Sequence, residues 1–195
     1  MTRTLVAMLL VIAALVRIAA AEPTDAGTEV AARQMLIAVR VLSYDKSLAD
    51  RARDSAVTIA LVSSATQEGR SARARFAAAF ALMPKLKVGG KPVHVVTFEI
   101  ATRKTLESAL VATRPSMLIV LDDLGDQLGV VSDIARARAI LTVSLREADV
   151  GRGLSVGVVQ SGERNEILIN VEAARSEGAR FGAGLLQLAR LVDGS

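Results

Sequence analysis

Very few side chains in this sequence have the chemistry of a catalytic or metal-binding group. The 195 residues contain no cysteine and one histidine, His94. A thiol nucleophile, a thiolate metal site and a multi-histidine zinc site are therefore excluded. A Ser-His-Asp triad would have to use His94, which stands between Val93 and Val95 in a strand-like run. Side chains alternate along a strand, so His94 faces away from both valines, and we expect a structural or surface histidine.

The densest acidic group is Asp122, Asp123 and Asp126, directly after the apolar run 117–121. The carboxyl end of a strand is where α/β sheets tend to bind ligands. Paired carboxylates there could bind a hard cation or perform acid/base chemistry. Because the spacing of an EF-hand is not matched, we favour a solvated loop that caps the next helix.

Two hydroxyl residues, Ser63 and Ser64, follow the first apolar run and precede a helix. Hydroxyls and free backbone N–H groups could hold an anion there, although a plain helix cap is the simpler interpretation. The sequence has no phosphate-binding glycine motif and no G-x-S-x-G motif. Ser63, Ser64, Asp122 and Asp123 therefore remain the candidate ligand-binding residues.

Apolar runs and helical patterns alternate along most of the chain, which predicts the elements that would position these residues. The predicted strands are 57–62, 92–100, 117–121, 139–143, 154–160 and 166–171. The predicted helices are 28–52, 66–83, 102–112, 128–138, 171–177 and 182–192, and 151–153 is a loop. Alternation favours a mostly parallel sheet with helices on both faces, and the last two strands form a hairpin. The fold class is thus α/β, a three-layer domain with a C-terminal β-hairpin and helices.

The first 21 residues resemble a secretory signal peptide. Arg3 precedes an apolar run from Leu5 to Val16, and Ala19 to Ala21 supply small residues for cleavage. A membrane span needs about 20 apolar residues, and Arg17 interrupts the run before that length. We expect a cleaved leader over 1–21 and a single domain over 22–195, exported to a periplasm, with an uncleaved N-terminal anchor as the alternative.

The remaining charge gives little sign of a polyanionic partner. Without Arg3 and Arg17, the chain has 22 basic and 20 acidic residues, and no block of five basic residues. Aromatic residues make up 3% of the chain. Nucleic-acid binding usually requires a basic stripe or stacking aromatics, so we do not expect a nucleic-acid partner. No cofactor is expected.

The last third of the chain carries a set of ordered short motifs. The segments are Ile140 to Ser144 (ILTVS), Gly153, Ile167 to Val171 (ILINV) with Asn170, Ala173–Ala174, Gly178 and Leu185 to Ala189 (LLQLA). Near the start, Val41 to Leu48 reads VLSYDKSL and contains Tyr44 and Asp45. This order resembles the YfiR-like family of small periplasmic proteins. Within it, Tyr44, Asp45, Gly153, Asn170, Ala174, Gly178, Leu185 and Leu186 are expected to be structural residues.

The resemblance implies a periplasmic α/β protein with no catalytic residues to carry over. The best-known member restrains a membrane-bound diguanylate cyclase by binding its periplasmic part, and it can dimerise. Two departures matter: better-known members carry cysteines, which this chain lacks, and Phe181 to Gly184 stand where a serine often precedes the paired leucines. Redox switching and specific partner contacts are therefore not carried over.

These observations favour a non-catalytic periplasmic regulator that binds an inner-membrane signalling protein, such as a cyclase or kinase, with a homodimer as an expectation. A periplasmic solute-binding module, with its ligand near Ser63, Ser64 and Asp122, is the alternative. A hydrolase that uses His94 or the aspartates is the weakest of the three interpretations.

Overall fold

The computed structural model describes residues 26–52, 55–162 and 164–194, and the predicted leader lies outside them. The strands are β1 (Val57–Ser63), β2 (Lys87–Val88), β3 (Lys91–Glu99), β4 (Met117–Val120), β5 (Leu141–Ser144), β6 (Val156–Ser161), β7 (Arg164–Ile169) and β8 (Arg190–Leu191). The helices are α1 (Ala26–Ser43), α2 (Leu48–Arg51), α3 (Gln67–Ala81), α4 (Arg103–Thr113), α5 (Gln127–Arg138), α6 (Glu147–Gly151), α7 (Val171–Ser176) and α8 (Ala183–Leu188). No helix in the described ranges combines the length and apolar character that a bilayer span requires.

The eight strands form one sheet in the order β2-β3-β1-β4-β5-β6-β7-β8. Strands β3, β1, β4, β5 and β6 run parallel, and β6 and β7 form the expected antiparallel hairpin. The predicted mostly parallel α/β fold is therefore confirmed. The chain adds β3 on one side of β1 and then β4 on the other. The carboxyl ends of β1 and β4 thus form the topological switch point, where such sheets tend to bind ligands.

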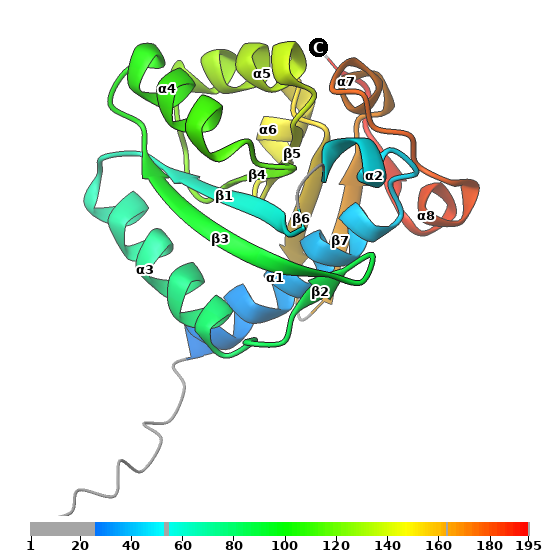
Figure 1. Cartoon of the computed structure of the whole chain (residues 1–195), viewed down its shortest axis with the longest axis horizontal. Coiled ribbons are helices and arrows are strands. Elements are labelled where there is room, and N and C mark those ends of the chain that lie inside the picture. The colour runs from blue at the N-terminus through cyan, green and yellow to red at the C-terminus, as the bar shows by residue number, and fades with distance from the viewer. Residues whose placement is uncertain (1–25, 53–54, 163, 195) are drawn as a thin grey trace, which may run out of the picture.

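Helices cover both faces of the sheet (Figure 1). On one face, α1 and α3 bury Met35 and Phe76 against strand residues such as Ile59. On the other, α4 and α5 bury Leu110 and Val131 in a second apolar cluster. Because β1 is enclosed on both faces, its side chains are apolar almost throughout instead of alternating with polar ones.

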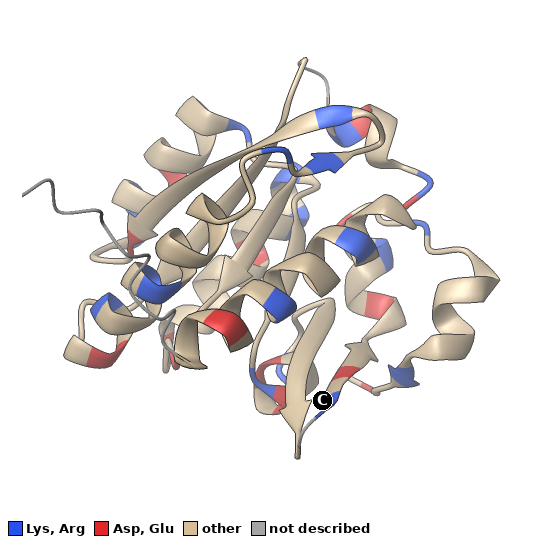
Figure 2. Cartoon of the chain, turned by 90° about the horizontal axis from the view of Figure 1, so that it is seen from below, with Lys and Arg blue, Asp and Glu red and all other residues tan. Residues whose placement is uncertain are grey.

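Charged residues are spread over the helices and loops. Seen from below in Figure 2, basic and acidic positions are interspersed along the ribbon. Arg33 with Glu29 in α1 and Arg103 with Glu107 in α4 form exposed ion pairs within one helix. Pairs of this kind contribute little to stability individually, so the two apolar clusters account for most of the stability of the fold.

The prediction of one long helix over 28–52 is wrong in its second half. Helix α1 ends at Ser43, and only Leu48–Arg51 is helical again, as α2. Between them, the backbone of Asp45 forms an isolated antiparallel bridge with Phe181. A continuous helix could not place Asp45 in this bridge, so a contact with the C-terminal part of the chain overrides local helical preference.

The C-terminal part also departs from the expectation. The helix predicted over 182–192 ends at Leu188, and Arg190–Leu191 pairs with β7 as the parallel strand β8. The predicted loop 151–153 is wrong in its first residue, because Gly151 ends a short helix, α6, that was not predicted. The strand predicted from Ala139 starts at Leu141, because Ala139 adopts a left-handed conformation (φ 54°) that ends α5.

Candidate functional site

Ser64 and Asp122 meet at the switch point, directly after β1 and close behind β4. Asp122 Oδ1 accepts a hydrogen bond from Ser64 N at 2.9 Å, and Asp122 Oδ2 accepts one from Ser64 Oγ. Both residues are buried. Their polar atoms are bonded to each other, and this contact fastens together the loops that follow the two central strands.

The same contact continues into the first turn of α3. Thr66 is the N-cap of this helix and accepts a hydrogen bond from Gly69 N at 3.0 Å. Ser64 Oγ lies 2.7 Å from Thr66 Oγ1. A Cβ atom at Gly69 would lie 2.5 Å from Ser64 O and 2.7 Å from Asp122 Oδ2, so only glycine fits. The helix N-terminus is therefore closed by side chains and packed backbone rather than open to an anion.

The other two candidate residues point to different partners. Ser63 Oγ accepts a hydrogen bond from Arg73 at 3.1 Å. Asp123 accepts one from Gly125 N at 2.9 Å and forms an ion pair with Arg146 at 2.7 Å. The Gly125 N–H first, and then Arg146, hold the pKa of Asp123 below its ordinary value. Asp123 is thus an exposed, ionised carboxylate beside a cation.

A crevice of about 570 Å³ opens beside this cluster, between α1, α3 and the loops after β4 and β5. We call it the carboxyl-edge crevice. Asp122 and Asp123 line it, but Ser63 and Ser64 do not. Its other polar lining residues are Gln34, Glu68, Arg75, Arg146 and Gln160. The lining mixes both signs of charge with apolar side chains, which suits a small polar solute better than a strongly charged one.

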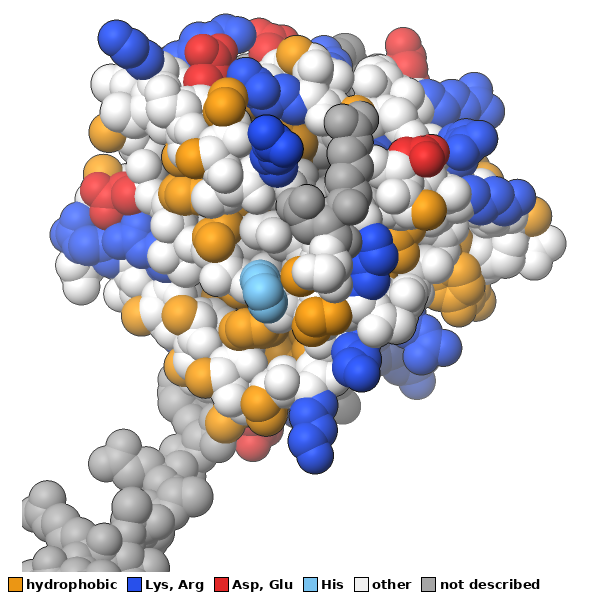
Figure 3. Space-filling view, in the orientation of Figure 1, with side chains coloured by type: hydrophobic (Ala, Val, Ile, Leu, Met, Phe, Trp, Pro, Cys, Tyr) orange, Lys and Arg blue, Asp and Glu red, His pale blue; other side chains and the backbone are white. Residues whose placement is uncertain are grey.

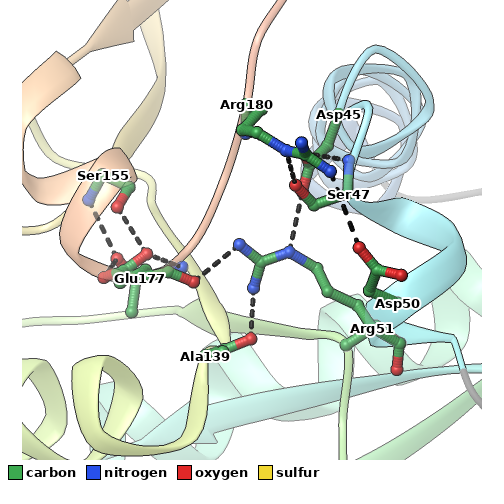
Figure 4. A network of polar contacts seen from close by, with 10 residues as sticks. Asp45, Ser47, Asp50, Arg51, Ala139, Ser155, Glu177 and Arg180 are labelled. Carbon is green, nitrogen blue, oxygen red and sulfur yellow. Dashed lines mark hydrogen bonds and ion pairs between the residues drawn. The ribbon is translucent and has the colours of Figure 1, made fainter.

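A second polar cluster lies at the opposite, amino edge of the sheet (Figure 4). We call its members Asp45, Ser47, Arg51, Glu177 and Arg180 the amino-edge network. Asp45 Oδ1 accepts hydrogen bonds from Ser47 N at 2.9 Å and Arg180 N at 2.8 Å. Asp45 Oδ2 accepts one from Arg51 Nε at 2.7 Å, and both side chains of this ion pair are buried. One carboxylate thus joins α2 to the segment before α8.

Arg51 extends the network to two further helix ends. Its guanidinium donates to the carbonyl oxygens of Ala139 and Glu177, the latter at 2.6 Å. Ala139 ends α5 and Glu177 ends α7. The last carbonyls of a helix lack partners within it and carry partial negative charge, so a cation there is stabilising. The guanidinium satisfies both helix ends and the carboxylate of Asp45 at once.

The side chain of Glu177 is fully buried and turns toward β5 and β6. Its carboxylate accepts hydrogen bonds from Thr142 N at 2.8 Å, from Thr142 Oγ1 at 2.6 Å and from Ser155 Oγ. Burial raises the pKa of Glu177 to about 7, against the lowering effect of these donors and of Arg51. Among the described residues, Glu177 is therefore the one whose pKa is brought close to neutral pH by burial.

A cavity of about 620 Å³ adjoins this network. We call it the amino-edge cavity. Arg51, Arg114, Arg138 and Arg180 line it with one acidic residue, Asp50, and its apolar wall includes Leu110, Val111, Pro115 and Ile140. The ends of α4, α5 and α7 also face this edge, and their partial negative charge opposes the field of the arginines. Of these arginines, Arg51 bonds directly to the carbonyl oxygens that end α5 and α7.

The family-motif residues occupy a helix cap, turns, the core and, for Tyr44, the surface. Asn170 is the N-cap of α7: its side chain accepts from Ala173 N at 3.0 Å and donates to Val150 O at 3.2 Å. Gly153 and Gly178 have φ values of 101° and 77°, which favour glycine. Ala174 and Leu185 are buried, Leu186 packs against the same core, and Tyr44 is exposed at 38%.

His94 lies on β3, exposed and far along the chain from the acidic cluster. The sequence reasoning did not identify Arg51, Glu177 or Arg180. An Asp whose side chain accepts from the N–H two residues on is a common turn device, so Asp45 and Ser47 carried a local signal. No local signal connects Asp45 with Arg180, 135 positions later.

A family model described as YfiR/HmsC-like matches residues 34–190. The chain belongs to this family. The match begins within α1 and includes every later element except the last residue of β8, so it covers both the switch point and the amino-edge network. No curated protein sequence matches the chain. The expected resemblance to YfiR-like proteins is confirmed.

Solved structures with the same fold include a substrate-binding protein. A ligand-free, open substrate-binding protein with adhesive properties, CD0873 from Clostridium difficile, aligns with a TM-score of 0.55 and 15% identity, over 77% of this chain and 58% of its own. The ABC domain in complex with L-Trp from Streptococcus pneumoniae aligns with a TM-score of 0.55 and 14% identity, over 83% and 60%. A conserved domain protein from Vibrio cholerae aligns with a TM-score of 0.58 and 14% identity, over 83% of this chain and 59% of its own. The chain spans less than two thirds of each, and the likeness concerns the fold alone.

Proposed function

We propose that this chain is an exported periplasmic protein that regulates an inner-membrane signalling protein by binding its periplasmic part, without catalysing a reaction. The observation that carries the proposal is the match to the YfiR/HmsC-like family over residues 34–190. The predicted leader over 1–21 supports export, and the signalling protein would be a cyclase or a kinase.

The engagement of the candidate residues supports a binding role over catalysis. Ser64 and Asp122 are bonded to each other, and Ser63 is bonded to Arg73. A serine nucleophile of a Ser-His-Asp triad needs the imidazole within hydrogen-bond reach. His94 lies on β3 and not beside Ser64 and Asp122, so the one histidine and these residues do not form a common site.

Regulation by binding requires that the protein distinguish two states of its partner. A binder shifts a two-state equilibrium only by the difference between its affinities for the two states. We therefore expect the chain to bind the inhibited or the active form of the signalling protein more tightly, and to leave the partner's activity unchanged where the two affinities are equal.

A membrane pull-down tests the proposal. The mature chain, residues 22–195 with a C-terminal tag, is incubated with detergent-solubilised inner membranes, beside an unrelated exported bait with the same tag. We expect enrichment of an inner-membrane protein with a periplasmic domain, and direct binding of that purified domain in calorimetry. Turnover of a substrate by the mature chain, or binding to no such membrane protein above the control bait, would contradict the proposal.

A solute-binding module is the second candidate, and the carboxyl-edge crevice favours it. Its volume of about 570 Å³ is within the range of small-molecule pockets, and a solved substrate-binding protein shares the fold. Thermal-shift screening of the mature chain with amino acids and other small polar solutes tests this function. Replacement of Arg75, which is exposed in the crevice, should abolish a genuine shift, whereas the control Arg138→Ala in the amino-edge cavity should preserve it.

A further inference from the structure

One corner of the molecule is built from a stretch of chain that is basic throughout. From Gly69 to Phe98 the sequence has six lysine and arginine residues and no aspartate or glutamate. This stretch contains most of α3, the strand β2 and nearly all of β3, which are neighbours because α3 packs against β3 and β2 pairs with it. We call the exposed surface of residues 70–87 the basic corner. The charge of the whole chain is nearly balanced, so the excess at this corner is local.

Most of these basic side chains have no carboxylate partner in the described part of the chain. Arg73 pairs with Glu99 at 3.0 Å, and Lys91 donates to Ala52 O. The other four side chains are exposed and have no acidic group of the described residues within ion-pair distance; they are Arg70, Arg75, Lys85 and Lys87. Cations that are not neutralised within the chain produce a positive potential, which attracts an extended anionic surface.

A large apolar side chain stands among these cations. Leu82 directly follows α3 and is exposed at 58%, and Lys85 and Lys87 follow it in the turn to β2 and in β2 itself. Between Arg75 and Leu82, the exposed residues are all alanines, Ala77, Ala78 and Ala81. Their side chains are short, so they leave Leu82 accessible to a flat surface. In Figure 3, apolar side chains lie over the part of the molecule where Figure 1 places α3, and basic side chains lie at the lower border of the view.

We propose that the basic corner binds the surface of a lipid bilayer that contains anionic phospholipid. Leu82 enters the headgroup region, and Arg75, Lys85 and Lys87 lie beside the lipid phosphates. Such a bilayer presents a plane of negative charge above apolar chains, and cations around an exposed apolar group complement both. This inference goes beyond the proposed regulatory function and does not depend on it. On the proposed export, the contact would hold the chain at the membrane that contains its partner.

Charge and shape favour a bilayer over other occupants. Leu82, Lys85 and Lys87 line neither the carboxyl-edge crevice nor the amino-edge cavity, and a small anion would gain nothing from the leucine. A second copy seated on this corner would bring like charges together, at an energetic cost. Nucleic acid would require stacking aromatics, and both aromatic residues of α3, Phe76 and Phe80, are buried or half-buried. An acidic protein surface is the remaining occupant, and vesicles of pure lipid distinguish it from a bilayer.

Cosedimentation of the mature chain with vesicles tests the proposal. The chain should sediment with vesicles of phosphatidylglycerol and phosphatidylethanolamine, and it should remain in solution with vesicles of phosphatidylcholine alone. Salt at about 1 M should release the bound chain, because the screening length then falls to about 3 Å. Equal binding to both kinds of vesicle, or binding to neither, would overturn the proposal. The pull-down from detergent-solubilised membranes does not depend on this result, so the two proposals can fail separately.

Removal of single charges tests whether the basic corner is the part that binds. Lys85→Gln and Lys87→Gln should each weaken binding to the anionic vesicles about fivefold, which is the usual contribution of one basic residue at such a surface. Lys104→Gln is the matched control: it removes the same charge from an exposed position of α4, on the other face of the sheet, and should have little effect. Equal weakening by all three substitutions would show that net charge drives binding, and would overturn the proposal.

The absence of native tryptophan allows a direct measurement of the orientation at the bilayer. In Leu82→Trp, the emission should shift to shorter wavelength when anionic vesicles are added, because indole favours the membrane–water interface. Val111→Trp, at a position of α4 that is exposed at 48%, is the matched control and should keep the emission of an indole in water. An equal shift in both variants, or an unshifted Leu82→Trp that still sediments with the vesicles, would overturn the proposed contact.

Discussion

The two ends of the sheet carry polar clusters of similar composition and different character. At the carboxyl edge, Asp122 holds Ser64 in a compact pair beside a crevice that remains open to solvent. At the amino edge, Asp45 and Arg51 form a buried ion pair that fastens α2 to helix ends far along the chain. The difference shows that acidic and hydroxyl residues near strand ends do not mark a ligand site by themselves. What distinguishes the ends is how many separate segments each cluster joins.

The strongest test of this comparison removes the central cation of the amino edge. Arg51→Ala should lower the free energy of unfolding by about 3–5 kcal/mol, because the buried carboxylate of Asp45 and two helix ends lose their partner. Urea denaturation measures the change. Asp50→Ala is the control: its pair with Arg180 is exposed on both sides, and its loss should cost less than about 1 kcal/mol. Equal effects of the two substitutions would contradict the structural role of the network.

Glu177 should make the amino edge sensitive to pH. Its pKa is about 7 in the folded chain and near 4.5 when exposed, so the folded state binds the extra proton between these values. The contribution of this group is fully present below pH 4.5 and is lost as the pH rises through 7, by up to roughly 3 kcal/mol. Glu177→Gln should flatten this part of the stability profile in urea titrations at pH 5, 6 and 7. Parallel profiles for the variant and the wild type would show that the group does not titrate there.

A smaller effect is expected from filling the glycine position at the carboxyl edge. Gly69→Ala should destabilise the chain by about 1–3 kcal/mol, because the new methyl group overlaps Ser64 O and Asp122 Oδ2. Gly129→Ala in α5 is the matched control, since nothing lies within 4 Å of its Cβ position. That substitution should stabilise the helix by about 0.5–1 kcal/mol. Thermal unfolding followed by circular dichroism separates the opposite signs.

The smallest effect concerns the exposed ion pair of the carboxyl-edge crevice. Arg146→Ala should raise the pKa of Asp123 toward its ordinary value, although the Gly125 N–H continues to hold it down. The stability of the fold should hardly change, because the pair is exposed. A carboxyl titration by NMR measures the pKa, and Arg75→Ala in the same crevice should leave it unmoved. A large loss of stability in Arg146→Ala would contradict the comparison, because this exposed ion pair would then stabilise the fold as the buried pair of Asp45 and Arg51 does.

The sequence predicted the sheet well because its central strands are continuous apolar runs, as in Val57 to Val62, and because alternation with helices implies parallel pairing. The positions of Ser64 and Asp122 after their strands followed from the same reasoning. It did not predict the break after Ser43 or the strand Arg190–Leu191, since both depend on pairing with residues distant along the chain. Local periodicity is similar for such segments and for a continuing helix, so only the tertiary contact decides between them.

The candidate site was predicted in part for a related reason. Strand order places the carboxyl ends of β1 and β4 side by side, which brings Ser64 to Asp122, but it cannot tell whether two polar side chains bond to each other or to a ligand. The role of Arg51 was hidden because its partners include main-chain carbonyls, which have no sequence signature. The cavity lined by Arg114 and Arg138 was hidden likewise, since these residues end or follow different helices.

The bond from Arg180 N to Asp45 joins positions 135 residues apart, and β8 completes the far side of the sheet only at residues 190–191. In a nascent polypeptide, these two contacts therefore cannot form until residues 180–191 have emerged from the ribosome. Long-range closure of this kind slows folding. On the proposal that the chain is exported, a translocation machinery that threads unfolded polypeptides would meet it before these long-range contacts have formed.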